Sequence, residues 1–161
     1  MANRTVTVTV ASGTLYVVGG TGNSFYIDGT RPGDFTVDWV KDGTIRFEQS
    51  GSSNDGHPLI FSTSNSSTLG TMQAGIISSG VTYYLDGSSN QSDYTNTTTF
   101  NAATTRYIEI APASQTDFYF ACWIHGIQMG GIMDLLQDSW GAISWGDNAW
   151  NSSNNLIDVT G

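Results

Sequence analysis

The stretch FYFACWIHGIQMGG, residues 118–131, carries most of what the sequence says about fold and chemistry. It continues the segment TDFYFACW (116–123), whose alternating, aromatic-rich pattern predicts a β-strand. It also holds the only cysteine of the chain, Cys122, followed by His125 and Met129. A thiolate, an imidazole and a thioether on one short segment form a ligand set for a soft metal ion. This stretch therefore predicts a strand followed by a candidate metal-binding loop.

Period-two alternation extends through much of the remaining chain and predicts further strands. RTVTVTV (4–10) alternates threonine and valine, as a strand with one buried face does, and TRYIEIAP (105–112) alternates similarly. The other expected strands cover residues 14–20, 23–29, 35–40, 41–50, 57–64 and 80–87. Gly-Thr-Gly predicts a hairpin turn between the second and third strands in chain order, and Asp-Gly predicts one between the fourth and fifth. Short strands joined by glycine-rich turns predict an all-β protein, either a sandwich or a barrel.

Two regions depart from this pattern. Residues 62–104 are rich in serine and asparagine and predict long loops on a rigid body, around the strand at 80–87. No stretch before Gly130 has the periodicity of a helix, and only residues 132–140 are compatible with a short helical turn. We therefore expect a strand-rich body with long Ser/Asn-rich loops.

Length and composition restrict the class of protein. The 161 residues suit one packed domain, and the single cysteine excludes an internal disulfide. Five basic and fourteen acidic residues give a net charge of −9, so nucleic acid and anionic membranes are not expected as partners. The opening MANRTVTVTVAS has no apolar run of signal-peptide length, and no later segment is apolar enough to span a bilayer. We therefore expect a protein that is made in the cytosol without a leader.

Both histidines of the chain, His57 and His125, fall where a copper site would need them. A blue-copper centre uses two histidines and one cysteine with a weak axial methionine, because copper alternates between a state that prefers sulfur and one that prefers nitrogen. One histidine comes from far upstream, which here is His57 at the head of HPLIFSTS (57–64). Each residue alone has an ordinary explanation: Cys122 as a small buried apolar residue, His125 as a loop residue and Met129 as core filler. Together they favour descent from a copper site, in a fold that can persist without metal.

The segment TIRFEQSGSSNDGHPLIFSTS (44–64), followed by DFYFACWIHGIQMGG (117–131), resembles a cupredoxin, a Greek-key β-sandwich of the plastocyanin and amicyanin type. The resemblance covers about residues 35–131. The Cys-x2-His spacing matches plastocyanin-like proteins, and the His-x3-Met spacing lies between the loop lengths of amicyanin and plastocyanin. The resemblance implies a copper ion with His57, Cys122 and His125 as its equatorial ligands. It implies Met129 as the axial ligand.

Three features set this chain apart from a cupredoxin that shuttles electrons. Such proteins usually carry an export signal, which this sequence does not show. The loops within 62–104 are longer and richer in serine and asparagine than a compact shuttle needs. Trp123 and Ile124 place bulk between the cysteine and the histidine, where many family members have small residues or proline. A bound metal is therefore expected to be structural or vestigial.

A C-terminal extension, residues 132–161, follows the expected cupredoxin-like body at 1–131. Trp140, Trp145 and Trp150 recur there every five residues. On one continuous strand or helix this spacing would point the indoles in different directions, so a run of Trp-Gly turns over an apolar surface fits better. The rings either cap the domain's own sheet or anchor the extension, as an arm, in pockets of a neighbouring subunit, where tryptophan buries a large area at little entropic cost.

The tail, the MAN-TVTVTVASG type of opening and the cupredoxin-like body together resemble small structural proteins of marine cyanobacterial phages. This resemblance implies a non-enzymatic capsid decoration or a tail or fibre component. It would be made in the host cytoplasm, reside in the virion, form homo-oligomers and bind other virion proteins through the arm. The alternative is a type 1 blue-copper electron-transfer protein, and a third possibility is a module whose Ser/Asn-rich loops contact glycans. A hydrolytic triad is not expected, because the copper pattern uses both histidines.

Overall fold

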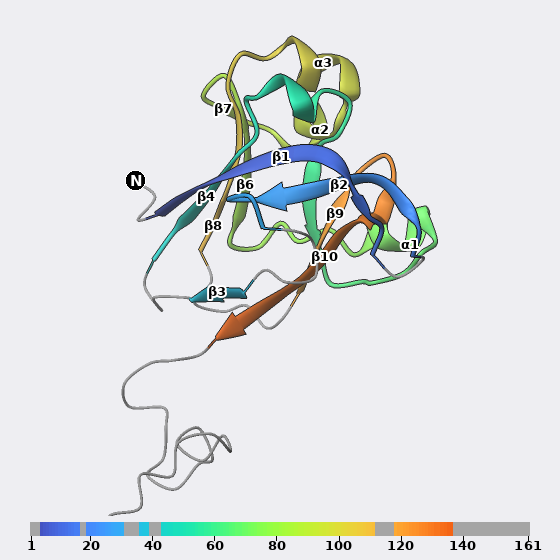
Figure 1. The fold of residues 1–161 in the computed structure, drawn as a ribbon. Coiled ribbons are helices and arrows are strands. Elements are labelled where there is room, and N and C mark those ends of the chain that lie inside the picture. The colour runs from blue at the N-terminus through green and yellow to red at the C-terminus, as the bar shows by residue number, and fades with distance from the viewer. Residues whose placement is uncertain (1–3, 17–18, 31–35, 39–42, 112–117, 137–161) are drawn as a thin grey trace, which may run out of the picture.

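The computed structural model describes residues 4–16, 19–30, 36–38, 43–111 and 118–136 (Figure 1). Within them, ten strands form one six-stranded and one four-stranded sheet. The strands are β1 (Arg4–Thr14), β2 (Thr21–Ile27), β3 (Thr36–Asp38), β4 (Ile45–Glu48), β5 (Leu59–Ser62), β6 (Val81–Leu85), β7 (Ser88–Ser89), β8 (Arg106–Ile110), β9 (Phe118–Cys122) and β10 (Gly126–Leu136). The described chain is therefore mostly β, and the expected all-β class is confirmed.

The six-stranded sheet has the order β2-β1-β4-β8-β6-β7. Strand β1 pairs with β2 in an antiparallel hairpin and with β4 in parallel, while β8 pairs antiparallel with both β4 and β6. Alternate residues of two central strands are buried, namely Ile45 and Phe47 in β4 and Ile108 and Ile110 in β8. One face of this sheet therefore lines the core, as the period-two alternation predicts.

The four-stranded sheet has the order β3-β10-β9-β5. Strand β9 pairs antiparallel with β5 and β10, and β3 lies parallel to β10. The register between β9 and β10 shifts between Gly126 and Gly131. Inside this irregular stretch, a β-carbon on Gly130 would lie 1.7 Å from the carbonyl oxygen of Phe120, so only glycine permits the close approach of the two strands.

Aromatic rings join the two sheets into one core. Phe47 of β4 meets Phe61 of β5 edge to face, with ring centroids 5.0 Å apart, and Phe61 meets Phe118 of β9 at 5.2 Å. All three rings are buried. Because Phe47 and Phe61 belong to different sheets, the sheets pack face to face across this contact.

Residues 62–104 contain short helices as well as the expected strand at 80–87, which is β6, so the prediction that long loops make up the rest of this region is wrong. The helices are α1 (Leu69–Ala74), α2 (Gln91–Thr95) and α3 (Thr97–Ala102), and a 3-10 turn, η1 (Ser52–Asn54), precedes the region. The side chains of Asn90 and Asn96 accept hydrogen bonds from the first turns of α2 and α3, while Tyr94 and Phe100 anchor these helices in the core. Helices of five or six residues are too short to show a helical period in the sequence. No helix in the described residues is long and apolar enough to cross a membrane.

The first hairpin lies earlier in the chain than its predicted position. Strand β1 continues to Thr14 and β2 begins at Thr21, so the described residues 15–16 and 19–20 of the expected strand at 14–20 lie in the connection between β1 and β2. The backbone N–H of Leu15 donates to the carbonyl of Gly20 at 3.0 Å across this connection. Pairing of β1 with β2 as far as Thr14 extends the strand beyond the clean Thr-Val alternation.

Two further predictions need correction. Strands β3 and β4 lie in different sheets, so 35–40 and 41–50 do not form the expected hairpin. The Asp-Gly signal indicates a local reversal, but the two strands pair with different neighbours, β3 with β10 and β4 with β1 and β8, and this pairing places them in different sheets. Strand β10 continues to Leu136, so the part of 132–140 up to that residue is a strand rather than a helical turn. The division of the chain between a body and an extension at 131/132 stays a prediction.

Candidate metal centre

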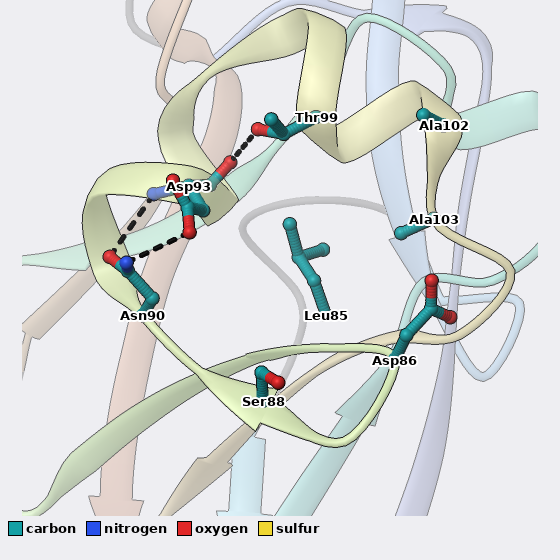
Figure 2. Close-up of a pocket in the computed structure, with 8 residues that line it drawn as sticks. All are labelled: Leu85, Asp86, Ser88, Asn90, Asp93, Thr99, Ala102 and Ala103. Carbon is teal, nitrogen blue, oxygen red and sulfur yellow. Dashed lines mark hydrogen bonds between the residues drawn. The ribbon is translucent and has the colours of Figure 1, made fainter.

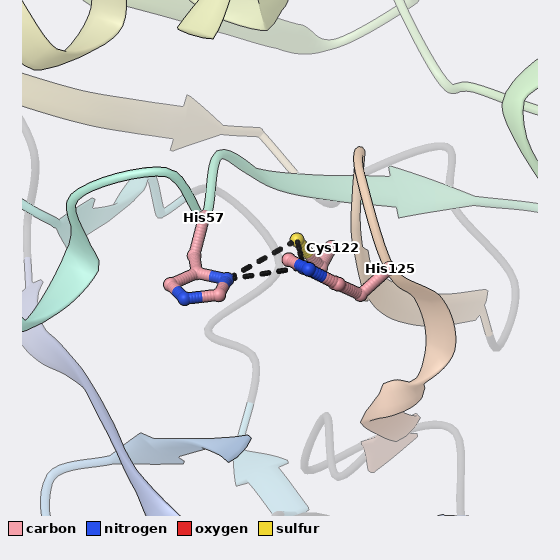
Figure 3. A group of neighbouring side chains, drawn as sticks. All are labelled: His57, Cys122 and His125. Carbon is pink, nitrogen blue, oxygen red and sulfur yellow. Dashed lines mark hydrogen bonds between the residues drawn. The ribbon is translucent and has the colours of Figure 1, made fainter. Parts of the chain in front are cut away.

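His57, Cys122 and His125 lie together, although His57 and Cys122 are 65 residues apart in sequence (Figure 3). The two Nδ1 atoms are 3.2 Å apart. Cys122 Sγ lies 3.4 Å from Nδ1 of His125 and 3.8 Å from Nδ1 of His57. The candidate ligand atoms of all three side chains lie within 4.8 Å of one another, and Figure 3 shows the His57 ring directed from its loop toward the other two residues.

The antiparallel pairing of β5 with β9 explains why these residues meet. Leu59, the first residue of β5, lies opposite Cys122, the last residue of β9. The loop before β5 therefore reaches the same end of the sheet as the turn after β9. His57 belongs to that loop and His125 to that turn, and Gly126, with a φ of 79°, completes the turn into β10.

The separations of the three donor atoms fit one metal ion. With metal–sulfur and metal–nitrogen bonds of about 2.3 and 2.0 Å, as for zinc, trigonal ligands would have N···N and S···N separations of about 3.5 and 3.7 Å, and tetrahedral ligands about 3.3 and 3.5 Å. The observed N···N distance is 3.2 Å and the S···N distances are 3.4 and 3.8 Å. The differences are small enough for side-chain rotations to absorb, so the backbone already has the geometry that the ion would need.

The contact between the two imidazoles restricts their protonation. Without a cation, two Nδ1 atoms at 3.2 Å form a hydrogen bond only when one is protonated and the other is not. Burial of His57 lowers its pKa, and the neighbouring His125 lowers it further. Neutral imidazole is also the form that binds metals, so this environment favours the protonation state that a metal site requires.

Cys122 is fully buried, and burial raises the pKa of its thiol to about 11, because the thiolate is disfavoured away from water. Backbone hydrogen bonds from His125 and Ile124 act in the opposite direction. A bound cation would replace the thiol proton. Without a cation, Cys122 is a neutral and inaccessible thiol at neutral pH, as expected for a buried cysteine.

Met129, the predicted axial ligand, is buried in β10 and only 2% exposed. It lies within the irregular stretch of the β9–β10 pairing, between Gly126 and Gly131. Its burial is equally suited to a packing role in the core. An axial contact from Met129 therefore stays a prediction.

A buried amide, Gln49, holds the backbone at His57 and Leu59 and the side chain of Asn54, and nothing in the sequence pattern identifies it. Its Nε2 donates to the carbonyl of His57 and to Oδ1 of Asn54, both at 3.2 Å. Its Oε1 accepts from the backbone N–H of Leu59 at 2.9 Å and from the hydroxyl of Tyr94. All four hydrogen-bonding positions of the amide are thus filled, which fixes the loop that carries His57.

Three further hydrogen bonds hold this loop in place. The backbone N–H of His57 donates to the carbonyl of Asn54 at 2.9 Å, and Asn54 Nδ2 donates to the carbonyl of Val8 in β1 at 2.8 Å. The backbone N–H of Trp123 donates to the carbonyl of Pro58 at 2.9 Å and so joins the two ligand-bearing segments directly. The chain contains many asparagines, and the sequence alone does not show which of their side chains are buried. The structure identifies Asn54 as a buried one.

A separate pocket of about 250 Å³ lies beside the β6–β7 turn and helices α2 and α3 (Figure 2). It is lined by Leu85, Asp86, Ser88, Asn90, Asp93, Thr99, Ala102 and Ala103. Oδ1 of Asp86 accepts hydrogen bonds from the backbone N–H groups of Thr104 and Thr105. Asn90 Nδ2 donates to Oδ2 of Asp93 within the first turn of α2. These contacts stabilise the local turns, and the pocket lies apart from the metal centre.

The remaining predicted site residues, Trp140, Trp145 and Trp150, lie outside the described residues, so their partner-binding role stays a prediction. The functional conclusion therefore depends on the geometry and chemistry of the histidine–cysteine cluster. Comparisons of the chain with protein-family models, with curated proteins and with solved structures find no match.

Proposed function

We propose that this protein binds a single copper ion through His57, Cys122 and His125 and serves in one-electron transfer. This proposal adopts the blue-copper alternative in place of the structural or vestigial metal expected from the sequence. The convergence of two imidazole nitrogens and one buried sulfur within 4.8 Å carries this proposal. Two histidines and one cysteine in a trigonal arrangement are the donor set of blue-copper electron-transfer sites. When bound to such ligands, copper supplies a change between two oxidation states without rearrangement of the protein.

The arrangement of the strands supports a cupredoxin-like body for this site. The cysteine and one histidine lie at the junction of β9 and β10, the last two described strands in chain order. The other histidine lies at the head of β5, a strand adjacent to β9. This is the division of ligands that the resemblance to plastocyanin and amicyanin implies. A Greek-key sandwich of this type is accordingly the fold that we propose for the two packed sheets.

The different exposure of the ligands suits electron transfer. Cys122 is fully buried, whereas the side chain of His125 is exposed. The exposed large apolar residues of the described chain, Leu69 and Ile124, are each 38% exposed. Ile124 adjoins His125 in sequence, and Leu69 lies near Gly126 on its other side. A partner that contacts the exposed His125 would therefore also meet the apolar Ile124 beside it, while the sulfur remains shielded from water and oxidants.

The donor set also favours copper over other common metals. Nitrogen and thiolate donors bind divalent copper more tightly than divalent zinc, and thiolate further favours monovalent copper. Zinc would nevertheless fit donor atoms at these separations. An experiment must therefore test two points separately: whether the site binds a metal ion, and whether that ion is copper.

The test is a titration of the purified, metal-free protein with divalent copper at neutral pH. We expect one equivalent to bind and to produce the intense visible band of a copper–thiolate bond, and we expect Cys122→Ser to bind without that band. A protein that stays colourless with copper would contradict the proposal. A protein that stays colourless but binds one zinc ion through the same residues would retain the metal site and lose the electron-transfer function.

The virion role remains the other function expected from the sequence. It depends on Trp140, Trp145 and Trp150 as an arm, and these residues lie outside the described part of the chain. A copper site and a virion role are compatible, since one concerns the ligand end of the body and the other the C-terminal extension. The geometry of the metal centre supports the copper proposal alone.

A further inference from the structure

Gln73, on helix α1, makes a contact with the ligand-bearing turn that the sequence does not predict. Its Nε2 donates a hydrogen bond to the carbonyl oxygen of Trp123 at 2.8 Å, across 50 residues of sequence. Trp123 immediately follows Cys122 and precedes His125 by two positions. We propose that Gln73 is a positioning residue, which holds the turn in its ligand geometry before any metal binds.

Two hydrogen bonds, one at the backbone N–H and one at the carbonyl, restrain Trp123, and Gln73 provides the second. On one side, the backbone N–H of Trp123 donates to the carbonyl of Pro58, the residue after His57. On the other side, the carbonyl of Trp123 accepts from Gln73. The two bonds fix the orientation of both peptide groups of Trp123, and the second of these groups leads directly to Ile124 and His125. Without the Gln73 donor, that peptide would be held only by the hydrogen bond from the backbone N–H of Ile124 to Cys122, and the imidazole of His125 could move away from the cysteine more easily.

Helix α1 is well suited to deliver this restraint, because it is itself tied to β5 and its continuation. Ser62 Oγ donates to the carbonyl of Met72 at 2.8 Å, and the backbone N–H of Thr63 donates to the carbonyl of Gly75 at 2.9 Å. Met72 is fully buried in the core. The helix is therefore fixed to the strand whose head carries His57, and it reaches from there to the turn that carries His125. Rigid elements position ligands more accurately than loops do.

A second side chain of the same helix approaches the same turn. A β-carbon built on Gly126 would lie 3.8 Å from Cδ1 of Leu69, an ordinary contact distance. Helix α1 thus lies against the turn at Trp123 through Gln73 and at Gly126 through Leu69. Gly126 has no side chain, so Leu69 shows only that the helix lies close to the turn there. The directional hydrogen bond comes from Gln73, and we assign the positioning role to it.

The expected effect of Gln73 on copper affinity rests on the proposed copper site. Its expected effect on the exposure of Cys122 in the metal-free protein does not depend on that proposal. Outer residues that orient metal ligands typically contribute about 10- to 100-fold to metal affinity. We expect Gln73→Met to weaken copper binding by about 10-fold or more. We also expect the metal-free variant to expose its thiol more often, with labelling of Cys122 about 3- to 10-fold faster, the range that the loss of one hydrogen bond gives.

The experiment compares Gln73→Met and Gln73→Ala with the unchanged protein and with Gln91→Ala as a matched control. Methionine keeps the length of the side chain and a similar helix propensity but lacks the donor, so it separates the hydrogen bond from packing and folding effects. Gln91 is a partly buried glutamine on another short helix, α2, and its replacement controls for the loss of a helical glutamine. Each protein is tested by thiol labelling without metal and by competitive copper titration, and thermal melting establishes that it is folded.

Faster labelling and weaker copper binding in both Gln73 variants, with Gln91→Ala unchanged, would support the positioning role. Labelling rates and copper affinities equal to those of Gln91→Ala would overturn it. If the unchanged protein binds no copper, the proposed function fails, and the labelling rates alone then decide whether Gln73 restrains the turn. The two failures are thus distinguishable.

Discussion

Replacement of Gln49 by leucine tests the contribution of the buried amide to the loop that carries His57. The substitution leaves the backbone N–H of Leu59 and the hydroxyl of Tyr94 without their acceptor. Each buried donor left unpaired costs about 1–3 kcal/mol, so the two together cost about 2–6 kcal/mol. The apolar area gained by leucine offsets about 1–2 kcal/mol of this. At the midpoints of these ranges, we therefore expect the free energy of unfolding to fall by about 2.5 kcal/mol, a substantial part of the roughly 5–15 kcal/mol typical of a folded domain.

Urea unfolding of the metal-free protein measures this loss, provided that the dependence on urea concentration keeps its slope. Gln91→Leu provides the matched control, because Gln91 is a partly buried glutamine at the start of α2, and we expect it to change stability by less than about 0.5 kcal/mol. Gln49→Leu should also bind copper more weakly, because the carbonyl of His57 loses its donor. A loss of stability below about 1 kcal/mol would refute the assignment of Gln49 as the residue that organises this loop.

Two further outcomes follow from burial and chain organisation. Burial raises the pKa of Cys122 from its ordinary 9.0 to about 11, so the neutral thiol is favoured in the folded state, and the stability of the metal-free protein should fall as pH rises from 9 toward 11. The fall should be about 2–3 kcal/mol larger than in Cys122→Ser, and parallel unfolding curves across this pH range would contradict it. Deletion of 138–161 should leave a folded monomer that no longer assembles, as sedimentation would report, since the described strands all lie within residues 4–136. A truncated chain that does not fold would instead place the indoles in the domain's own core.

The sequence predicted strands best where one face of the strand is buried in the core. Residues 105–112 and 116–123 alternate clearly, and β8 and β9 lie within them. The sequence was a poorer guide to which sheet each strand joins, because sheet membership depends on contacts between distant segments. The Asp-Gly at 42–43 suggests a hairpin, yet β3 and β4 join different sheets. The short helices also escaped prediction, because none has a repeating apolar face. Asparagine caps and single buried aromatic residues hold α2 and α3, and α1 buries only Met72.

The metal centre shows the same division between local chemistry and long-range contacts. Residue type and spacing singled out His57, Cys122 and His125, because few side chains combine sulfur and nitrogen donors in this way. The folded chain brings these three together. The residues that support them, Gln49 and Gln73, are glutamines without any distinguishing pattern in the sequence. Their roles arise from hydrogen bonds that form only once β5, β9 and α1 are assembled.

Copper-edge X-ray absorption on the loaded protein tests the proposed ligand set most directly, because it reports the atoms bonded to the ion. We predict one sulfur at about 2.3 Å and two imidazole nitrogens at about 2.0 Å, by analogy with zinc. In Cys122→Ser the sulfur contribution at this short distance should disappear while imidazole scattering remains. A spectrum of the unchanged protein with nitrogen and oxygen neighbours but no short bond to sulfur would contradict the assignment of Cys122, and with it the proposed function.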